Sequence, residues 1–217
     1  MGLIALNAAL FVYELLLGSG LRDFILQWGL VPARLTLALR FGEEPVAAAA
    51  LTLFSSMFLH GGWLHLIGNM WYLWIFGDNV EDRLGHARYV LFYLSGGLVS
   101  ALTQYLAAPS STVPTVGASG AIAAVLGAYA VTFPRARVMT IIPLFLFWPI
   151  VALPALVVLG LWFVFQFFSG ALSLAWSAQG GVAWWAHIGG FLYGMLAMKL
   201  VAPRRAAPAA VQWSDRR

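Results

Sequence analysis

The sequence predicts an all-α polytopic membrane protein, mainly because of its composition. Of its 217 residues, 62% are hydrophobic and only 9% are charged, whereas soluble domains carry roughly 25% charged residues. Six stretches are apolar enough to enter a bilayer, which needs about 20 mostly apolar residues per helix. The chain contains no cysteine, which excludes disulfides and thiolate metal sites. The net charge of +4 is small and scattered, so we expect no nucleic-acid partner.

The first apolar segment, residues 2–17, begins without the basic flank or small-residue cleavage site of a signal peptide, so we expect a retained span. A long connection, about 18–62, follows it. Within this connection, residues 24–30 are amphipathic and flanked by arginines, which predicts a segment at the lipid headgroups. Residues 46–59 are apolar but short, which is typical of an interfacial or re-entrant segment. We therefore expect the first connection to be structured.

Five further apolar segments complete an expected bundle of six transmembrane helices. They are residues 63–76, 89–108, 116–133, 139–168 and 182–202. The fourth of these five carries three prolines and is too short for two spans, so we expect an interfacial lead-in at 141–148 followed by one helix. The six spans predict one domain, residues 1–202. The Pro- and Ala-rich tail, 203–217, is expected to be disordered.

Lysine and arginine set the expected orientation of the spans. Nine of the twelve lie in the second and fourth connections or at the C-terminal end: Arg83, Arg88, Arg135, Arg137, Lys199, Arg204, Arg205, Arg216 and Arg217. The other three, Arg22, Arg34 and Arg40, lie in the first connection, on the opposite side. This bias predicts that both termini are cytoplasmic. We expect the bacterial plasma (inner) membrane to be the location.

With this orientation, three separate segments carry polar groups where they enter the membrane from outside. His65 and Asn69 lie in the opening turns of 63–76, Ser119 near the start of 116–133, and His187 about five residues into 182–202. At 1.5 Å per residue, all four groups are expected within roughly 10 Å of the outer surface.

These groups can perform nucleophilic chemistry together. A serine hydroxyl is a weak nucleophile and needs an adjacent base, for which histidine is the usual residue. We therefore expect Ser119 to be the nucleophile and His187 the base. His65 and Asn69 are spaced i, i+4 and share one helix face. Both can donate hydrogen bonds to a developing negative charge, and one such donor is typically worth about 3 kcal/mol.

Small residues surround the expected nucleophile. Gly117, Ala118 and Gly120 leave the backbone of Ser119 open to a substrate, and free N–H groups at a helix start favour an oxyanion. Gly190 and Gly194 are expected to let the last helix pack closely against the helix that carries Ser119.

No carboxylate is positioned as a third catalytic member, because the acidic residues near 78–82 lie a membrane thickness away. We therefore expect a Ser-His dyad whose imidazole is oriented by packing. Among the remaining polar groups, Glu14 could snorkel to the outer surface, and His60 is expected to order the first connection. Gln104 and Gln166 are interpreted as helix-packing hydrogen bonders with no assigned role.

Each motif alone has another interpretation. The Gly117–Gly120 stretch could simply permit tight helix packing, and His187 could be a hydrogen-bonded interhelical residue. His65 and Asn69 could form a polar clasp between helices. The combination in this order is more specific than any single motif.

The ordered set resembles the rhomboid family of intramembrane serine proteases, over about residues 3–200. Residues 81–85 and the proline-containing entry to the fifth span are similar to bacterial members. The resemblance implies a six-helix bundle with a water-accessible cavity, Ser119 as nucleophile and His187 as general base. It implies an oxyanion hole of His65, Asn69 and the Ser119 N–H, with no metal or cofactor. It also implies that the first connection is a membrane-embedded hairpin, and that the fifth helix and residues 169–183 gate and cap the site.

Two departures from the family pattern stand out. Many members carry an aromatic residue, which stacks on the histidine, at the position of Ala123. That role is vacant here or filled by another side chain, with Tyr193 and Phe191 as candidates. The Trp-Arg pair found in the first loop of many members is not evident.

Three function classes follow. The leading hypothesis is a cofactor-free intramembrane endopeptidase whose partners are transmembrane protein substrates and the lipid bilayer, with the oligomeric state open. The second is a catalytically silent relative that binds or chaperones membrane helices. The third is a small transporter or channel, disfavoured because the sequence has no inverted repeat and no acidic residue near the midplane.

Overall fold

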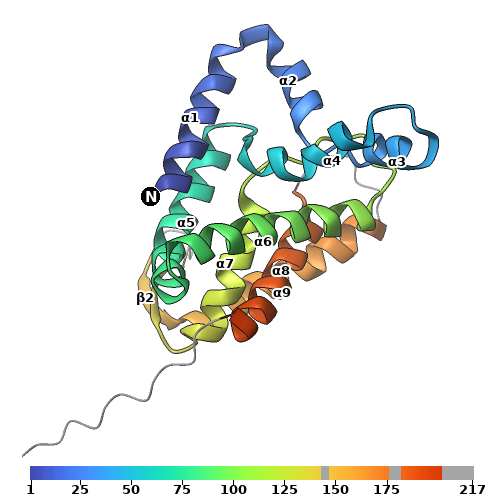
Figure 1. Ribbon diagram of the computed structural model, residues 1–217. Helices are drawn as coiled ribbons and strands as arrows, with labels where there is room; N and C mark the ends of the chain where they lie inside the picture. Colours follow the sequence, from blue (N-terminus) through green and yellow to red (C-terminus); the bar gives the residue numbers. More distant parts are fainter. Residues whose placement is uncertain (143–146, 176–181, 202–217) are drawn as a thin grey trace, which may run out of the picture.

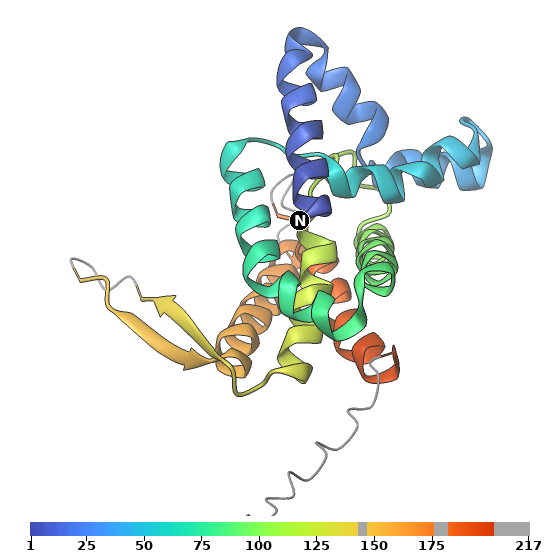
Figure 2. The ribbon, with the colours of Figure 1, turned by 60° about the vertical axis from the view of Figure 1, so that its left-hand side comes forward.

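The computed structural model describes residues 1–142, 147–175 and 182–201. Within these ranges the chain is mostly helical, with one two-stranded antiparallel hairpin (Figures 1 and 2). The elements in chain order are α1 (Gly2–Leu16), η1 (Gly18–Gly20), α2 (Leu21–Trp28), α3 (Pro32–Phe41), α4 (Val46–Ser55), η2 (Ser56–Phe58), α5 (Trp63–Leu84), α6 (His86–Ala107), α7 (Ser119–Thr132), β1 (Arg137–Ile141), β2 (Ile150–Pro154), α8 (Ala155–Ala175) and α9 (Trp184–Val201).

Helix α7 forms the centre of the bundle. Every residue from Gly120 to Ala130 is buried, and α5, α6, α8 and α9 all contact this helix. Alanines and glycines make up half of α7, which lets neighbouring backbones approach closely. Its 14 residues span only about 21 Å at 1.5 Å per residue, shorter than the roughly 30 Å hydrocarbon core of a bilayer. A helix of this length can reach one membrane surface while its other end stays recessed.

The crossing of α7 and α9 brings the two backbones into direct contact. A Cβ atom on Gly194 would lie 1.9 Å from the carbonyl oxygen of Ala124, and one on Gly190 would lie 2.2 Å from the carbonyl oxygen of Gly120. Any side chain at either glycine would therefore push the helices apart. His187 stands one turn before Gly190, so this crossing sets its distance from α7.

The N-terminal part of the chain packs on α5 and on the start of α7. Phe11 of α1 makes an edge contact with Trp63, with 5.0 Å between ring centroids. Glu14 is 1% exposed, and its carboxylate accepts hydrogen bonds from the backbone N–H of His60 at 3.2 Å. The expectation that Glu14 snorkels to the surface is wrong, because this N–H offers a partner inside the protein.

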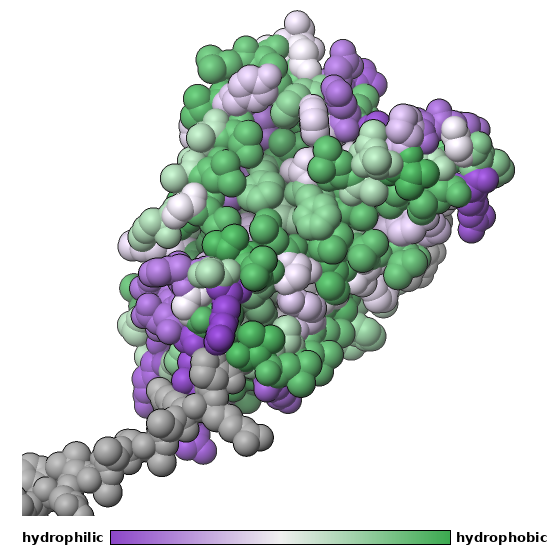
Figure 3. All heavy atoms as spheres, in the orientation of Figure 1, coloured by the Kyte–Doolittle hydropathy of each residue, from purple (hydrophilic) through white to green (hydrophobic). Residues whose placement is uncertain are grey.

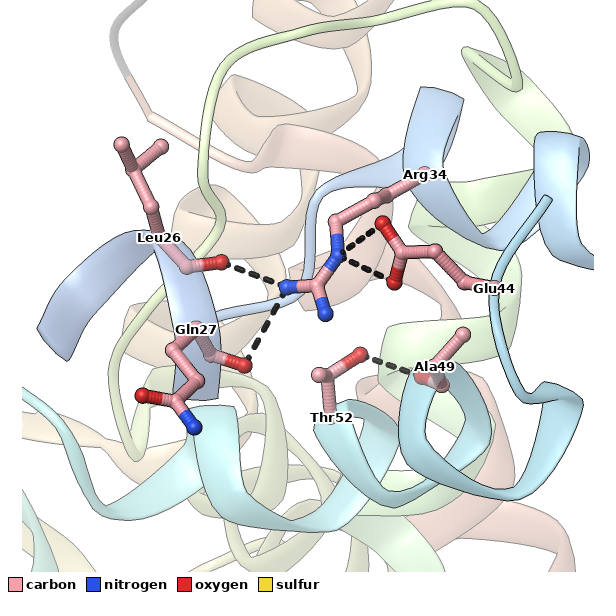
Figure 4. Close-up of polar contacts among 6 residues, drawn as sticks. All are labelled: Leu26, Gln27, Arg34, Glu44, Ala49 and Thr52. Carbon is pink, nitrogen blue, oxygen red and sulfur yellow. Dashed lines mark hydrogen bonds and ion pairs between the residues drawn. The ribbon is translucent and has the colours of Figure 1, made fainter. Parts of the chain in front are cut away.

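The first connection is structured, as expected. Arg34 holds two of its helices together, because its guanidinium donates to the Leu26 and Gln27 carbonyls and to the Glu44 carboxylate at 2.7 Å (Figure 4). Nearby, the Thr52 hydroxyl donates to the Ala49 carbonyl within α4. The connection also pairs with the segment before α7, since Leu30 and Thr115 exchange two backbone hydrogen bonds.

Each of the six apolar segments expected from the sequence contains one helix. The main difference lies in segment 139–168, where β1 and β2 form a hairpin in register from Arg137↔Pro154 to Ile141↔Ile150. Helix α8 begins directly after Pro154 and runs beyond residue 168, so residues 169–175 belong to this helix and not to a capping loop. The rest of the expected cap, 176–181, part of the lead-in, 143–146, and the tail, 203–217, lie outside the described residues.

The surface is that of a membrane protein. Figure 3 shows apolar side chains over the middle of the visible face, with hydrophilic residues gathered towards its two ends.

Among the described helices, α6 and α8 are each long and apolar enough to cross a membrane, and the number rises to four if two bent pairs are counted as single spans. The expected count of six is therefore not confirmed. Helix α7 is short, and α9 carries His187, two tryptophans and Lys199, which reduce its apolar character.

Candidate active site

A cavity of about 820 Å³ lies where the three polar signatures meet. His65 and Asn69 of α5, Ser119 of α7 and His187 of α9 all line it, together with the loop that precedes α7. Of its described lining residues, none is a carboxylate. They include no lysine or arginine either, so apolar and uncharged polar side chains surround the two histidines of the cavity.

Ser119 and His187 are hydrogen-bonded to each other. The distance from His187 Nε2 to Ser119 Oγ is 2.8 Å, within the reach required of a general base. Ser119 is the first residue of α7 and His187 lies in the first turn of α9. The pair is thus carried by the ends of two helices whose separation is set by the glycine crossing described above.

The other ring nitrogen of His187 is also engaged. Nδ1 lies 2.7 Å from Oε1 of Gln166 on α8. An amide oxygen can only accept, so Nδ1 carries the ring proton and donates a hydrogen bond to Gln166 Oε1. Nε2 is then the unprotonated nitrogen, and it accepts a hydrogen bond from the Ser119 hydroxyl. The expectation that packing alone orients the imidazole is incomplete, since a hydrogen bond contributes as well.

Trp162 of α8 packs beside the imidazole of His187 in a tilted contact, with ring centroids 5.8 Å apart and an interplanar angle of 36°. The two candidates named from the sequence lie elsewhere. Phe191 packs behind Trp162, and the Tyr193 hydroxyl lies 2.6 Å from Ser95 Oγ on α6. The aromatic residue beside the histidine therefore comes from a different helix than the one that carries Ala123.

His65 and Asn69 lie against the turn that precedes Ser119. A Cβ atom on Gly117 would be 2.6 Å from His65 Nε2 and 3.6 Å from Asn69 Nδ2, and Gly117 has a φ of +124°, so only glycine fits there. Asn69 is 8% exposed, and among the described residues its Nδ2 has no hydrogen-bond partner. A buried donor without a partner is costly, which is consistent with a donor reserved for a ligand.

A residue of the first connection binds the backbone just before Ser119. Gly117 N–H donates to the Ser56 carbonyl at 2.9 Å, and Ile122 N–H makes the first helical bond, to Ala118. The N–H groups of Ser119, Gly120 and Ala121 precede this bond, so they have no partner within α7. These donors lie at the positive end of the helix dipole, which favours an anion.

Of the remaining polar residues, Gln104 and His86 have hydrogen-bond partners, whereas neither ring nitrogen of His60 has one among the described residues. The Ala186 N–H donates to Gln104 Oε1 at 3.3 Å, so Gln104 caps α9 from α6. His60 is 2% exposed and packs its ring on Phe11 and His65. His86, at the opposite end of the bundle, contacts Glu81 at 2.7 Å. The contacts of Gln166 and Trp162 with His187 were not predicted from the sequence. Gln166 could have been noticed as a candidate site residue, because it is polar and lies within an apolar helix.

Comparison with known proteins identifies one family. The profile of the Rhomboid domain matches residues 47–204. The chain is 32% identical over 162 residues to "Presenilin-associated rhomboid-like protein A, mitochondrial" of Danio rerio, covering 71% of this chain and 39% of the relative. It is 29% identical over 201 residues to the corresponding Mus musculus protein, covering 89% and 46%. Against "Rhomboid protein 1, mitochondrial" of Saccharomyces cerevisiae it is 30% identical over 164 residues, covering 71% and 42%.

The chain spans less than half the length of these three relatives. All three are mitochondrial by name, so the similarity does not support the bacterial type or the bacterial plasma membrane expected from the sequence. Together with the apolar helices, it identifies an integral membrane protein.

Proposed function

We propose that this chain, which belongs to the rhomboid family, is an intramembrane serine endopeptidase that cleaves transmembrane helices of other proteins. The observation that carries the proposal is the 2.8 Å contact between His187 Nε2 and Ser119 Oγ, at the edge of a polar cavity of about 820 Å³. The proposed domain comprises residues 1–202, in which six segments cross the membrane. Residues 203–217 follow it on the cytoplasmic side.

The contact suggests the following reaction. Nε2 of His187 removes the hydroxyl proton of Ser119 as Oγ attacks the carbonyl carbon of the scissile peptide bond. The resulting oxyanion accepts hydrogen bonds from the Ser119 N–H and from the side chains of His65 and Asn69. His187 then protonates the leaving amine, and an acyl-enzyme forms. Water, activated by the same histidine, hydrolyses the ester and restores Ser119. No metal or cofactor is needed for any of these steps.

The short length of α7 supports cleavage below the membrane surface. Because α7 has only 14 residues, Ser119 would lie inside the bilayer thickness if the other end of the helix reached the opposite surface. A substrate helix must unwind locally to expose a peptide bond there, so segments with small or helix-destabilising residues should be preferred. We place the end that carries the cavity on the side with few lysines and arginines.

The non-catalytic alternative is a binder or chaperone of membrane helices. It is favoured by Ala123, because many family members carry at this position an aromatic residue that stacks on the histidine. Trp162 lies beside His187 in this structure, so Ala123 no longer supports the alternative. We therefore retain the endopeptidase as the single proposal.

The proposal is tested with the purified protein in lipid nanodiscs and a panel of tagged single-span proteins. We expect the wild type to cleave at least one of them, and Ser119→Ala and His187→Ala each to abolish that cleavage. A fluorophosphonate probe should label the wild type and leave Ser119→Ala unlabelled.

Two controls make the result specific. Ser95→Ala removes a hydroxyl whose partner is Tyr193, away from the cavity, and should retain cleavage and labelling. Thermal unfolding of each variant checks that loss of activity is not loss of fold. Normal cleavage by folded Ser119→Ala or His187→Ala would exclude the mechanism, and a wild type that takes no label and cleaves nothing would favour the silent binder.

A further inference from the structure

Helix α8 packs on α9 through one face, which carries a single amide among apolar residues. Leu159, Trp162, Phe163, Gln166 and Gly170 follow the helical repeat along this face. Phe163 stacks on Phe191 of α9 at 4.9 Å, and a Cβ atom on Gly170 would lie 3.3 Å from Trp184 and Ile188. Gln166 is 5% exposed in this environment. A buried amide is unfavourable unless it is hydrogen-bonded, and its partner here is His187.

The contacts of Gln166 and Trp162 fix His187 in two ways. Trp162 packs beside the imidazole in a tilted ring contact, and Gln166, one helical turn later, accepts a hydrogen bond from the Nδ1–H at 2.7 Å. Together they restrict both the rotation of the ring and the position of its proton. Trp184 closes a further side with an edge contact at 6.4 Å. The other titratable residues that line the same cavity are His65 and Tyr72 of α5.

The position of the proton matters because a neutral imidazole can carry it on either nitrogen. With the proton on Nε2, the ring could not accept the hydroxyl proton of Ser119. With it on Nδ1, the lone pair of Nε2 points to Ser119 Oγ, as the 2.8 Å contact requires. When His187 becomes positively charged during the reaction, the same hydrogen bond to Gln166 becomes charge-assisted and stronger.

We propose that Gln166 is a positioning residue that holds His187 in the tautomer able to act as a base, in the place where other serine hydrolases use a carboxylate. The inference rests on the proposed endopeptidase function. It adds that α8, through Gln166 and Trp162, determines whether the base on α9 is correctly protonated and oriented. Gln166 does not itself touch the substrate.

The first test reads the tautomer directly, without substrate. The chain has only four histidines, so ring-¹⁵N-histidine labelling in nanodiscs gives a simple spectrum, and His187→Gln assigns the signals of interest. We expect wild-type Nδ1 to be protonated and Nε2 unprotonated. Gln166→Met, which has similar length and no acceptor oxygen, should show a mixture of tautomers. Val164→Met is the matched control, because Val164 lies on the same helix and is 48% exposed.

The second test reads catalysis. Losing a hydrogen bond to a group that becomes charged typically lowers a rate by about 10- to 100-fold. We expect this fall in kcat for Gln166→Met, with KM little changed, and wild-type values for Val164→Met. Gln166→Glu keeps an acceptor and adds a negative charge that favours the imidazolium. It should restore much of kcat at high pH and move the acidic limb of the kcat profile to higher pH, which a purely structural role would not do.

The outcomes separate the two proposals. A wild type that neither cleaves nor takes the serine probe overturns the endopeptidase. A wild type that cleaves, with a Gln166→Met variant whose kcat and His187 signals are those of the wild type, overturns the positioning role. If Gln166→Met does not fold, Gln166→Asn is measured in its place, since its amide is too short to reach Nδ1 and the same shift of tautomer and kcat is required.

Discussion

At the scale of single residues, the polar atoms of the candidate site differ in whether they have a hydrogen-bond partner. His187 uses both ring nitrogens, one towards Ser119 and one towards Gln166. Asn69, by contrast, keeps its Nδ2 donor unpartnered among the described residues while being nearly buried. A group that loses water without gaining a partner costs about 1–3 kcal/mol of stability. Such a cost is typical of functional sites, where a donor is prepared for a charge that appears only during the reaction.

This contrast leads to a prediction for Asn69. Replacing it with alanine removes one oxyanion donor, so we expect kcat to fall roughly 100- to 1,000-fold while KM changes little. Because an unsatisfied buried donor is also removed, the variant should be at least as stable as the wild type. Single-turnover cleavage and thermal unfolding in nanodiscs measure the two effects. Ile67→Leu, a change on the exposed side of the same helix, is the control, and a wild-type kcat for Asn69→Ala would contradict the assignment.

The proposed catalytic pair, Ser119 and His187, could be named from the sequence, whereas the residues that contact His187 could not. Serine and histidine at the starts of alternate apolar segments are rare enough to indicate chemistry. Gln166 is visible as a polar residue in an apolar helix, yet its partner depends on how α8 rotates against α9. Trp162 gives even less signal, because tryptophan is common in membrane helices for other reasons.

At the scale of secondary-structure elements, the close contact of α7 and α9 decides where His187 lies. Gly190 and Gly194 pack against backbone carbonyl oxygens of α7. Gly127 of α7 packs against the backbone of α9, since a Cβ atom added to it would lie 2.0 Å from the Phe191 carbonyl oxygen. Small residues on both helices therefore bring His187 on α9 to the Ser119 hydroxyl on α7.

We predict that Gly194→Ala disrupts this crossing. The added methyl group would lie 1.9 Å from the Ala124 carbonyl oxygen, so the helices must separate, at a typical cost of about 1–3 kcal/mol. Thermal unfolding in nanodiscs should show the loss of stability, and cleavage should fall because His187 moves with α9. Gly160→Ala on α8 is a matched control, since nothing lies within 4 Å of the position of its Cβ. Equal stability of the two alanine variants would contradict the prediction.

The helical segments were largely predictable, and the hairpin was not. Long apolar runs identify the helices because only helices satisfy their own backbone groups in lipid. The three prolines between residues 139 and 168 indicated an interruption, and α8 does begin directly after Pro154. The interruption is a β-hairpin because β1 and β2 pair with each other, a contact between segments that no local pattern determines.

At the scale of the whole molecule, the proposed function requires that the cavity and the arginine-rich end lie on opposite sides of one membrane. Helix α6 connects the two ends and is one of the two described helices that could cross a membrane alone. Ala87 at its start and Ser110 just beyond its end are both exposed.

This arrangement predicts the outcome of cysteine labelling. The chain has no native cysteine, so Ala87→Cys and Ser110→Cys each report one position without background. After expression in Escherichia coli, an impermeant maleimide should label Ser110→Cys in intact cells and Ala87→Cys only after the inner membrane is permeabilised. The reverse pattern would invert the orientation, and labelling of both in intact cells would show that α6 does not span the membrane.

Taken alone, the sequence determined the class of the protein, the helical segments and the four polar residues of the candidate site, because composition and the position of polar groups along apolar runs are local properties. Only the tertiary structure decided that Ser119 meets His187, that α8 holds the imidazole through Gln166 and Trp162, and that Glu14 is buried against His60. These contacts join residues far apart in the chain. They depend on how closely α7, α8 and α9 can pack, which the glycines permit but which only the assembled bundle establishes.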